Sequence, residues 1–493
     1  MSASEPNGSL ELNSSMSFGW KGAFWYSIAI VLAIAAFYGI RNAGSELTAP
    51  PPDSSALTST ASDAIIGEKS GGAKPHVILH VTLTLAAVIA VGLLLGKLCR
   101  YIGQPPVIGE VIAGIFLGPS LLGALWPEGM QLLIPSTASD PAGHVPAALH
   151  AISQLGVILY MFLVGLELNA AQLKGRASAA VAVSHASIVA PFLLGSVLSL
   201  WLYPRLSNSA VPFTSFALFM GVAMSVTAFP VLARILSDRG LDKTPLGVLA
   251  LGCAAADDVT AWCLLAFVVG VATSQVQEGL MVALWSFVFI SAMLFIVRPL
   301  LLRFVARLDA RQKPLPPYAV SIVFLLVLLA AVCTEVIGIH GVFGAFLMGA
   351  VVPHNSRVAH EFSEKLKDMV GVLLLPAFFA YTGMRTQIGL VSGLDHWVMC
   401  FVVILTAVAG KFGGTLIAGR LVRQSWTTSA ALGILMNTRG LMELIVLNIG
   451  LDLGVISPTL FAMMVLMALA TTVMTSPALV WLLRRDSSGS IQS

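Results

Sequence analysis

Long apolar stretches recur along the whole of this 493-residue chain. A helix needs roughly 20 apolar residues to cross the hydrocarbon core of a bilayer, and on that criterion we mark fourteen segments. They lie near residues 22–40, 77–99, 105–124, 150–168, 178–203, 213–236, 245–272, 279–306, 317–337, 340–353, 367–385, 395–421, 427–452 and 456–483. Transmembrane β-strands alternate polar and apolar residues, and stretches such as FLLVLLAAV do not. The sequence therefore predicts an all-α polytopic membrane protein.

Composition and charge agree with a chain that lies in a lipid bilayer. Only 10% of the residues are Asp, Glu, Lys or Arg, against about 25% in soluble domains. Hydrophobic residues make up 57% of the chain, and the mean hydropathy is +0.90. The net charge of +3 is too small to indicate nucleic acid as a partner. The five cysteines form no CxxC pair, so we expect neither disulfides nor metal ligands.

The ends of the chain differ from its middle. We predict an N-terminal extension over residues 1–76, a membrane domain over 77–484 and a cytoplasmic tail over 485–493. The extension holds one anchoring helix, for which a secretory signal is the alternative, and a disordered linker in the Ser/Thr/Pro-rich stretch Ser45–Lys74. With the N-terminus in the cytoplasm, most Lys and Arg fall on the cytoplasmic side, as in the cluster over 298–313. We therefore place both termini in the cytoplasm and the protein in the cell's inner or plasma membrane.

Three charged residues lie near the middle of apolar segments: Asp257, Asp258 and Lys411. A charge at mid-bilayer costs on the order of 2.5–3.5 kcal/mol, so it usually marks a pathway or a partner. Adjacent residues on a helix point about 100° apart, so one aspartate can meet Lys411 while the other faces a cavity. An inert ion pair that holds two helices together is the alternative, but it leaves the second aspartate unexplained.

Two apolar segments contain residues that interrupt a helix. Pro230 removes a backbone hydrogen bond from SVTAFPVLARIL, and Asn437, Thr438, Arg439 and Gly440 interrupt GILMNTRGLMEL. A proline kink or a polar helix contact explains either one alone. Because irregular backbone at membrane depth must face protein or a water-filled cavity, the two together predict a transport site of the kind built from paired broken helices.

The remaining polar residues of the segments have simpler interpretations. Arg439 and Glu443 are four apart and can pair on one helical face, which indicates a structural role. Glu110 either lines an entry funnel or satisfies a helix terminus. The residues that we interpret as packing or helix-end groups are Glu167, Glu335, His80, His185 and His340.

The order of several motifs resembles the cation:proton antiporter superfamily, in the branch that contains Kef-type proteins and the plant cation/proton exchangers. The matching stretches are GQPPVIGEVIAGIFLGPSLLG, GVILYMFLVGLEL, SVTAFPVLARIL, ADDVTAW, GVFGAFLMGAVVP, LLPAFFAYTGMRT, GKFGG and NTRGLMEL, between about residues 77 and 484. The resemblance implies a sodium/proton-antiporter-like inverted-repeat fold of thirteen core helices, two of them discontinuous and crossed. It implies a mobile core and a dimerisation subdomain, hence a homodimer, and the segment 22–40 is extra to this plan.

The resemblance also assigns roles to residues by position. Asp258 matches the aspartate that carries the proton and binds the cation. Asp257, a second candidate ligand of the cation, matches the position that is Asp in electrogenic members. Lys411 matches the lysine that pairs with the first aspartate. Thr227 and Asn437 lie at the helix breaks and could contribute oxygen or dipole to a cation. The implied function is electrogenic exchange of Na⁺ or K⁺ for protons by alternating access, without a cofactor.

Other classes of function are alternatives to this one. The closest alternative is a Kef-like gated K⁺ efflux system or a cation channel that a separate subunit controls. Because no GxGxxG unit is present, we do not expect nucleotide gating within this chain. An enzyme is not expected, since we find no nucleophile–base set, HExxH motif or phosphate loop. Symport of an organic anion with sodium does not fit two aspartates and a lysine.

Overall fold

The backbone is helical throughout the part of the chain that the structure describes. This computed structural model describes residues 20–51, 76–135, 140, 143–167, 177–241, 244–273, 276–310, 316–338 and 340–489. Most of the predicted linker Ser45–Lys74 and residues 490–493 lie outside that set, so the prediction of a disordered linker stays a prediction.

The helices of the first half are α1 (Trp20–Gly44), α3 (Val77–Tyr101), α4 (Pro106–Leu117), α5 (Leu122–Leu125), α6 (Pro127–Leu133), α7 (His144–Glu167), α8 (Ala177–Leu206), α9 (Phe213–Ser225), α10 (Phe229–Asp238) and α11 (Pro245–Thr273). Those of the second half are α12 (Val276–Ala292), η1 (Met293–Val297), α13 (Arg298–Asp309), α14 (Pro317–Ile337), α15 (Gly341–Val351), α16 (Arg357–Met369), η2 (Val370–Leu374), α17 (Leu375–Arg385), η3 (Ile388–Leu390), α18 (Gly393–Leu421), α19 (Trp426–Met436), α20 (Leu441–Asp452) and α21 (Pro458–Gly489).

Each of the fourteen predicted segments coincides with helical backbone, so the prediction of an all-α membrane fold is confirmed. Within the described residues, eleven helical stretches are long and apolar enough to cross a membrane. The other predicted segments correspond to shorter apolar helices, namely α9, α15 and α19. The number of membrane crossings stays a prediction, because these short helices need a neighbouring segment to complete a span.

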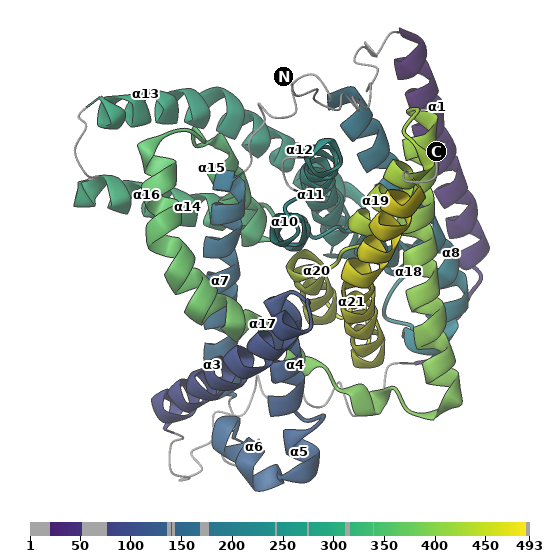
Figure 1. The fold of residues 1–493 in the computed structure, drawn as a ribbon. Coiled ribbons are helices and arrows are strands. Elements are labelled where there is room, and N and C mark those ends of the chain that lie inside the picture. Colours follow the sequence, from purple (N-terminus) through teal and green to yellow (C-terminus); the bar gives the residue numbers. More distant parts are fainter. Residues whose placement is uncertain are drawn as a thin grey trace, which may run out of the picture.

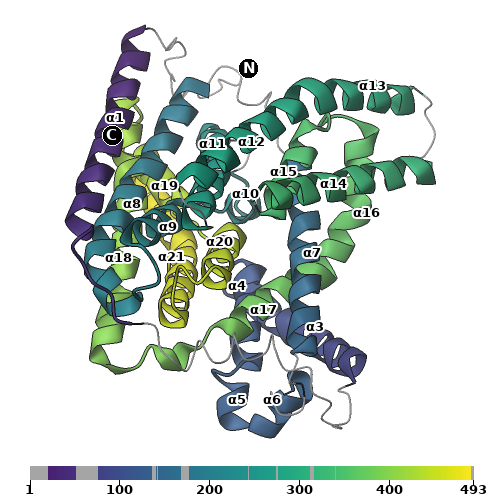
Figure 2. The same ribbon diagram turned by 180° about the vertical axis from the view of Figure 1, so that it is seen from behind.

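The helices form two groups, which Figures 1 and 2 show on opposite sides of the molecule. We call α8–α11 and α18–α21 the site group, and α3, α4, α7 and α12–α17 the scaffold group. Within each group, helices far apart in sequence pack closely, as α8 does with α18 and α7 with α15. Few helix pairs join the two groups, although one large apolar core includes residues of both.

Glycine allows a close approach of two helices inside the scaffold group. A Cβ atom on Gly165 of α7 would overlap the backbone carbonyl of Phe346 on α15, and one on Gly349 would overlap that of Phe162. The two helices therefore touch through their backbones at this crossing, where only hydrogen fits. Such small-residue contacts are typical of helix packing in membranes, and they make α7 and α15 a firmly joined pair.

A polar bridge connects the two groups at the ends of α17 and α20. Arg385 donates to the carboxylate of Asp452 at 2.6 Å and to the side-chain oxygen of Asn448 at 3.0 Å. Asn448 in turn donates to Thr382 Oγ1 at 2.9 Å. Arg385 and Thr382 belong to the scaffold group, whereas Asn448 and Asp452 belong to the site group. We call these four residues the α17–α20 bridge.

The first helix, α1, packs against the site group. Its contacts lie with α8 and α9, and the rings of Phe37 and Phe192 are 5.6 Å apart. Phe37 and Ile40 pack against the large apolar core that residues of both groups form. Much of the rest of α1 is exposed and apolar, and its role as an anchoring helix stays a prediction.

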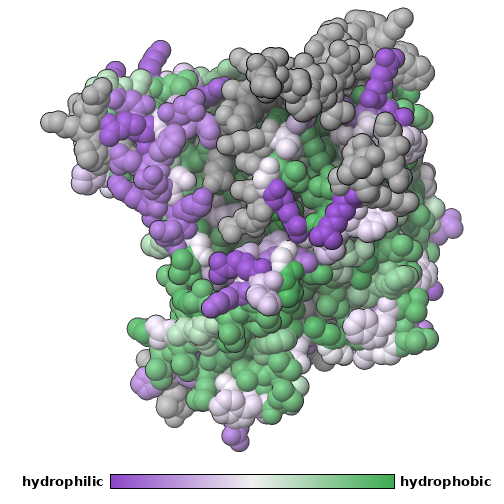
Figure 3. Space-filling view, viewed as in Figure 1, coloured by the Kyte–Doolittle hydropathy of each residue, from purple (hydrophilic) through white to green (hydrophobic). Residues whose placement is uncertain are grey.

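Two boundaries differ from the prediction. The segment 367–385 is part of a longer helical stretch that begins at Arg357, because α16 is an amphipathic helix whose charged face lowers its hydropathy. The last helix, α21, continues to Gly489, so helix extends into the predicted tail 485–493. Figure 3 shows hydrophilic residues gathered over α13 and α16 and a broad hydrophobic surface below them. That boundary is typical of a membrane–water interface.

Candidate functional site

The two interrupted helices meet at their breaks. Between α9 and α10 the chain is extended, with Val226 at φ −65° and ψ 138°, and Pro230 lies at the start of α10, where its missing N–H does no harm. Between α19 and α20 the break covers 437–440. Ala228 N–H donates to the carbonyl of Thr438 at 3.0 Å. This bond joins one break to the other, so backbone groups freed by each are partly satisfied by the other.

Asp257 lies beside these breaks, fully buried on α11. Ser184 donates to its Oδ1 at 2.5 Å, and Ser187 donates to its Oδ2 at 2.7 Å. Thr227, from the first break, donates to Oδ2 at 2.8 Å. Both carboxylate oxygens therefore have hydroxyl donors, and a buried charge is tolerated only with such partners.

Lys411 completes the surroundings of Asp257. It is fully buried on α18, and its Nζ lies 2.9 Å from Asp257 Oδ2. Nζ also donates to Thr227 Oγ1 at 2.5 Å. The contact between Lys411 and the first aspartate is thus present, and it joins α11, α18 and the break after α9. The charge of Asp257 is compensated in place by a lysine and three hydroxyls.

Asp258 has different surroundings from its neighbour. It is 2% exposed, and its Oδ1 has no hydrogen-bond partner among the described residues. The backbone N–H of Phe229, at the beginning of α10, faces its carboxylate, which is where a helix attracts negative charge. Asn437 Oδ1 and Thr438 Oγ1, in the second break, are also buried without a described partner. The breaks therefore hold oxygen atoms that can accept a proton or contact a cation.

The family model described as "Sodium/hydrogen exchanger, transmembrane" matches residues 85–485 of the chain. The chain belongs to the sodium/hydrogen exchanger family. The sequence-based resemblance to cation:proton antiporters is thereby confirmed.

Two relatives and one solved structure are similar to this exchanger. The Na(+)/H(+) antiporter NhaS4 of Synechocystis sp. is 43% identical over 406 residues, which cover 82% of this chain and 97% of that protein. Cation/H(+) antiporter 17 of Arabidopsis thaliana is 38% identical over 82% of this chain, which spans only 48% of that protein. The sodium proton antiporter MjNhaP1 of Methanocaldococcus jannaschii superposes with a TM-score of 0.57 at 13% identity, covering 82% of this chain and 96% of that one. At that identity the structural likeness shows the fold alone, and the fold is the predicted antiporter-like one.

Arg439 and Glu443 of this exchanger form a buried pair next to the site. Arg439 Nη1 lies 2.9 Å from Glu443 Oε2 and also donates to the carbonyl of Ala223, while Nη2 donates to the carbonyl of Met224. Those carbonyls belong to the last turn of α9, where helical acceptors lack partners within the helix. The pair therefore ties the second break to the end of α9, which agrees with a structural role.

Other residues singled out from the sequence lie elsewhere in the exchanger. Glu110 is half-buried on α4 of the scaffold group and faces α3, where its Cγ lies near Gly92. Glu335 accepts from the N–H of Gly341 at 2.7 Å, and the ring of His340 accepts from Val342 N–H, so both cap α15. His80 contacts the carbonyl of Leu132, and His185 is half-buried on α8. The side chains of Glu167 and Pro230 lie outside the described residues.

Ser184 and Ser187 were not expected at the exchanger's site. They are one helical turn apart on α8 and fully buried. Two serines spaced i, i+3 within an apolar segment share one face of a helix, and this spacing is the signal that could have identified them. Their target, however, follows only from the packing of α8 against α11 and α18.

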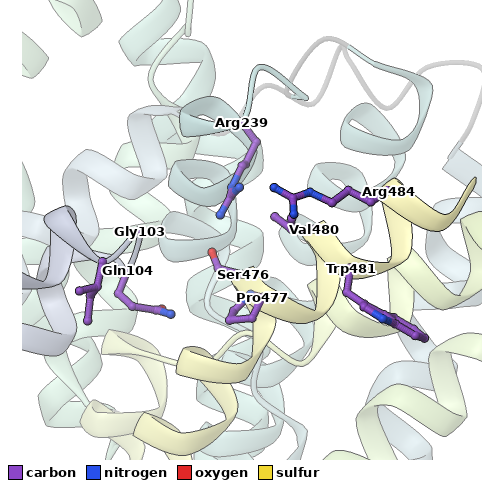
Figure 4. Close-up of a pocket in the computed structure, with 9 residues that line it drawn as sticks. Gly103, Gln104, Arg239, Ser476, Pro477, Val480, Trp481 and Arg484 are labelled. Atoms are coloured by element: carbon purple, nitrogen blue, oxygen red, sulfur yellow. The ribbon is translucent and has the colours of Figure 1, made fainter. Parts of the chain in front are cut away.

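A separate pocket of about 420 Å³ lies where the two groups meet, and Figure 4 shows its lining. Gly103 and Gln104 line it from the scaffold group, and Arg239, Ser476 and Arg484 from the site group. Neither Asp257 nor Asp258 is among its lining residues. Two guanidinium groups extend over the same space in Figure 4, and they repel cations. We therefore do not place the cation-binding site in this pocket.

Proposed function

We propose that this protein exchanges a monovalent cation, Na⁺ or K⁺, for protons, and that both occupy Asp258 in turn. The observation that carries the proposal is the difference between two neighbouring buried carboxylates. Asp257 is saturated by Lys411 and hydroxyl donors, whereas Asp258 keeps an oxygen without a described partner. Membership of the exchanger family, and relatives named as antiporters, support exchange rather than catalysis.

The chemistry of the site fits a hard cation. Alkali cations prefer oxygen ligands. Helix α11 supplies the carboxylate of Asp258, and the breaks supply the hydroxyl of Thr227, with the side-chain oxygen of Asn437 as an accessory group. Either a proton or a cation neutralises Asp258, and a neutral site crosses a low-dielectric barrier at lower cost. We propose that the Asp257–Lys411 pair lies beside Asp258 and responds to its occupant, while the site group moves against the scaffold group.

Further features belong to the same proposal. We infer a homodimer in the cell's inner or plasma membrane, with both termini in the cytoplasm, and no cofactor besides the transported ions. We infer electrogenic exchange, in which cation binding at Asp258 weakens the Lys411–Asp257 pair and Lys411 supplies a second proton. The alternative, a gated channel or Kef-like efflux system, conducts without obligatory proton movement.

Purified protein in liposomes tests the exchange directly. A pH gradient is imposed, and the lumenal pH is followed while Na⁺, K⁺ or Li⁺ is added outside. We expect the added cation to dissipate the gradient, with saturation at a defined cation concentration. Cation uptake without proton movement would favour the channel, and the absence of both fluxes would contradict the proposed function.

A further inference from the structure

The helix α8 presents two serines to one carboxylate on another helix. Ser184 Oγ lies 2.5 Å from Asp257 Oδ1, and Ser187 Oγ lies 2.7 Å from Oδ2. One hydroxyl therefore meets each oxygen, which fixes both the position and the plane of the carboxylate. Because Ser187 is also 3.4 Å from Lys411 Nζ, the serines contact the ion pair from a third helix.

Elsewhere on α8, buried serines bind only backbone groups in the described contacts. Ser196 donates to the carbonyl of Ala217 at 3.2 Å, and Ser199 donates to that of Gly195 at 2.9 Å. Such bonds to backbone carbonyls are common for serine in helices. Ser184 and Ser187 differ because their acceptor is ionisable, and hydrogen bonds to charged groups are stronger than those between neutral groups.

The arrangement matters when a cation arrives at Asp258. Asp258 is next to Asp257 in the sequence. A cation bound at Asp258 therefore repels the ammonium of Lys411 and weakens the Lys411–Asp257 contact. Asp257 then keeps its charge in a buried place, which is costly unless other donors remain. Ser184 and Ser187 are such donors, and they belong to a helix that carries neither the aspartates nor the lysine.

We propose that Ser184 and Ser187 are positioning residues of the exchange site, which hold Asp257 and compensate its charge while Lys411 is displaced by the bound cation. The inference rests on the proposed function, because it concerns the site at which exchange takes place. It predicts that the two serines affect the affinity for the cation and not the maximal rate of exchange. The cation itself contacts Asp258, and the serines act through Asp257.

The variants Ser184→Ala, Ser187→Ala and the double variant test this assignment in liposomes. A hydrogen bond to a charged group contributes roughly 1.5–3 kcal/mol, and 1.4 kcal/mol corresponds to about a factor of ten. We expect each single variant to raise the KM for the cation by roughly tenfold, and the double variant to raise it further. The maximal rate should stay within about twofold of the wild type, because Asp258 is unchanged. The single variants carry the test if the double variant does not fold.

Two control variants separate positioning from packing. Ser199→Ala removes a buried hydroxyl from the same helix, and its KM should equal that of the wild type. Ser187→Thr keeps the hydroxyl, and its KM should lie closer to the wild type than that of Ser187→Ala. Thermal unfolding in detergent reports any loss of stability separately from KM.

The KM and the maximal rate of these variants show whether the assignment of the two serines is right. An unchanged KM in both alanine variants, or a KM change of the same size in Ser199→Ala, overturns the assignment of the serines. A lowered maximal rate with unchanged KM also overturns it, since the serines would then serve the chemistry of translocation or the fold. Wild-type protein that moves neither cation nor protons contradicts the proposed function itself.

Discussion

At the residue scale, the donors around the two aspartates distinguish Asp258, the proposed carrier, from Asp257. Asp257 accepts from Lys411, Ser184, Ser187 and Thr227. Asp258, in contrast, has an oxygen without a described partner, although it is as deeply buried. A proton or cation that bound Asp257 would have to replace donors already in place, whereas Asp258 offers an unused acceptor.

The variant Asp258→Asn tests this distinction. The amide keeps the shape of the side chain and removes a buried charge, so the protein should fold and its unfolding temperature should not fall. Cation-dependent proton flux in liposomes should be lost, because an amide cannot release a proton at Asp258. Exchange at a rate near that of the wild type would show that the carrier lies elsewhere.

Lys411→Ala tests the other half of the site. Removing one partner of a buried ion pair costs about 3–5 kcal/mol, and we expect the lower end of this range because three hydroxyls still face Asp257. The unfolding temperature in detergent should fall and exchange should be lost or altered. Lys365, an exposed lysine 3.3 Å from Glu361, supplies the control: Lys365→Ala should leave both measurements unchanged. Equal stability of Lys411→Ala and the wild type would argue against the buried pair.

At the element scale, the α17–α20 bridge connects helices of different groups. The side chains of Arg385 and Asp452 are 23% and 38% exposed, and exposed ion pairs contribute only about 0.2–1 kcal/mol. Loss of the α17–α20 bridge should therefore lower the free energy of unfolding only slightly. Movement of the site group away from α17 must break the bridge, so Arg385→Ala should increase the exchange rate by up to about fivefold.

A double-mutant cycle separates the bridge from other effects of these substitutions. Asp452→Ala should change the rate in the same direction, and the double variant should add little, because both remove one interaction. Arg205, whose guanidinium binds a carbonyl of its own helix α8, provides the matched control in Arg205→Ala. Fully additive effects of Arg385→Ala and Asp452→Ala would mean that the two residues act independently.

Much of the element order could be predicted from hydropathy, and the exceptions have physical causes. The apolar stretches show in the sequence because lipid requires them, and Pro230 marks a break because it removes a backbone donor. The amphipathic α16 was missed because its charged face masks the apolar one. The site was predicted only in part: buried charges reveal Asp257, Asp258 and Lys411, but Ser184 and Ser187 are ordinary residues until α8 packs against α11.

At the scale of the whole molecule, two helix groups that few helix pairs join suit a mechanism in which one moves against the other. The proposed cycle of two protons per cation moves net charge, and each charge across 100 mV corresponds to roughly 2.3 kcal/mol. Wild-type exchange should therefore change its rate when a membrane potential of either sign is clamped in liposomes. Asp257→Asn, if active, should lose most of this response. Exchange that is insensitive to voltage would exclude the two-proton cycle and leave Asp258 as carrier.

The position of α1 makes it a suitable place to detect the proposed movement of the site group against the scaffold group. Its packing against α8 and α9 means that a displaced site group would carry α1 along through the lipid. A donor dye at the exposed Ile34 of α1 and an acceptor at the exposed Val336 of α14 would thus report the displacement by resonance energy transfer. The signal should fluctuate while cation and pH gradients drive the protein and become steady when they are dissipated. A dye pair placed on α14 and α16, both in the scaffold group, should give constant transfer throughout.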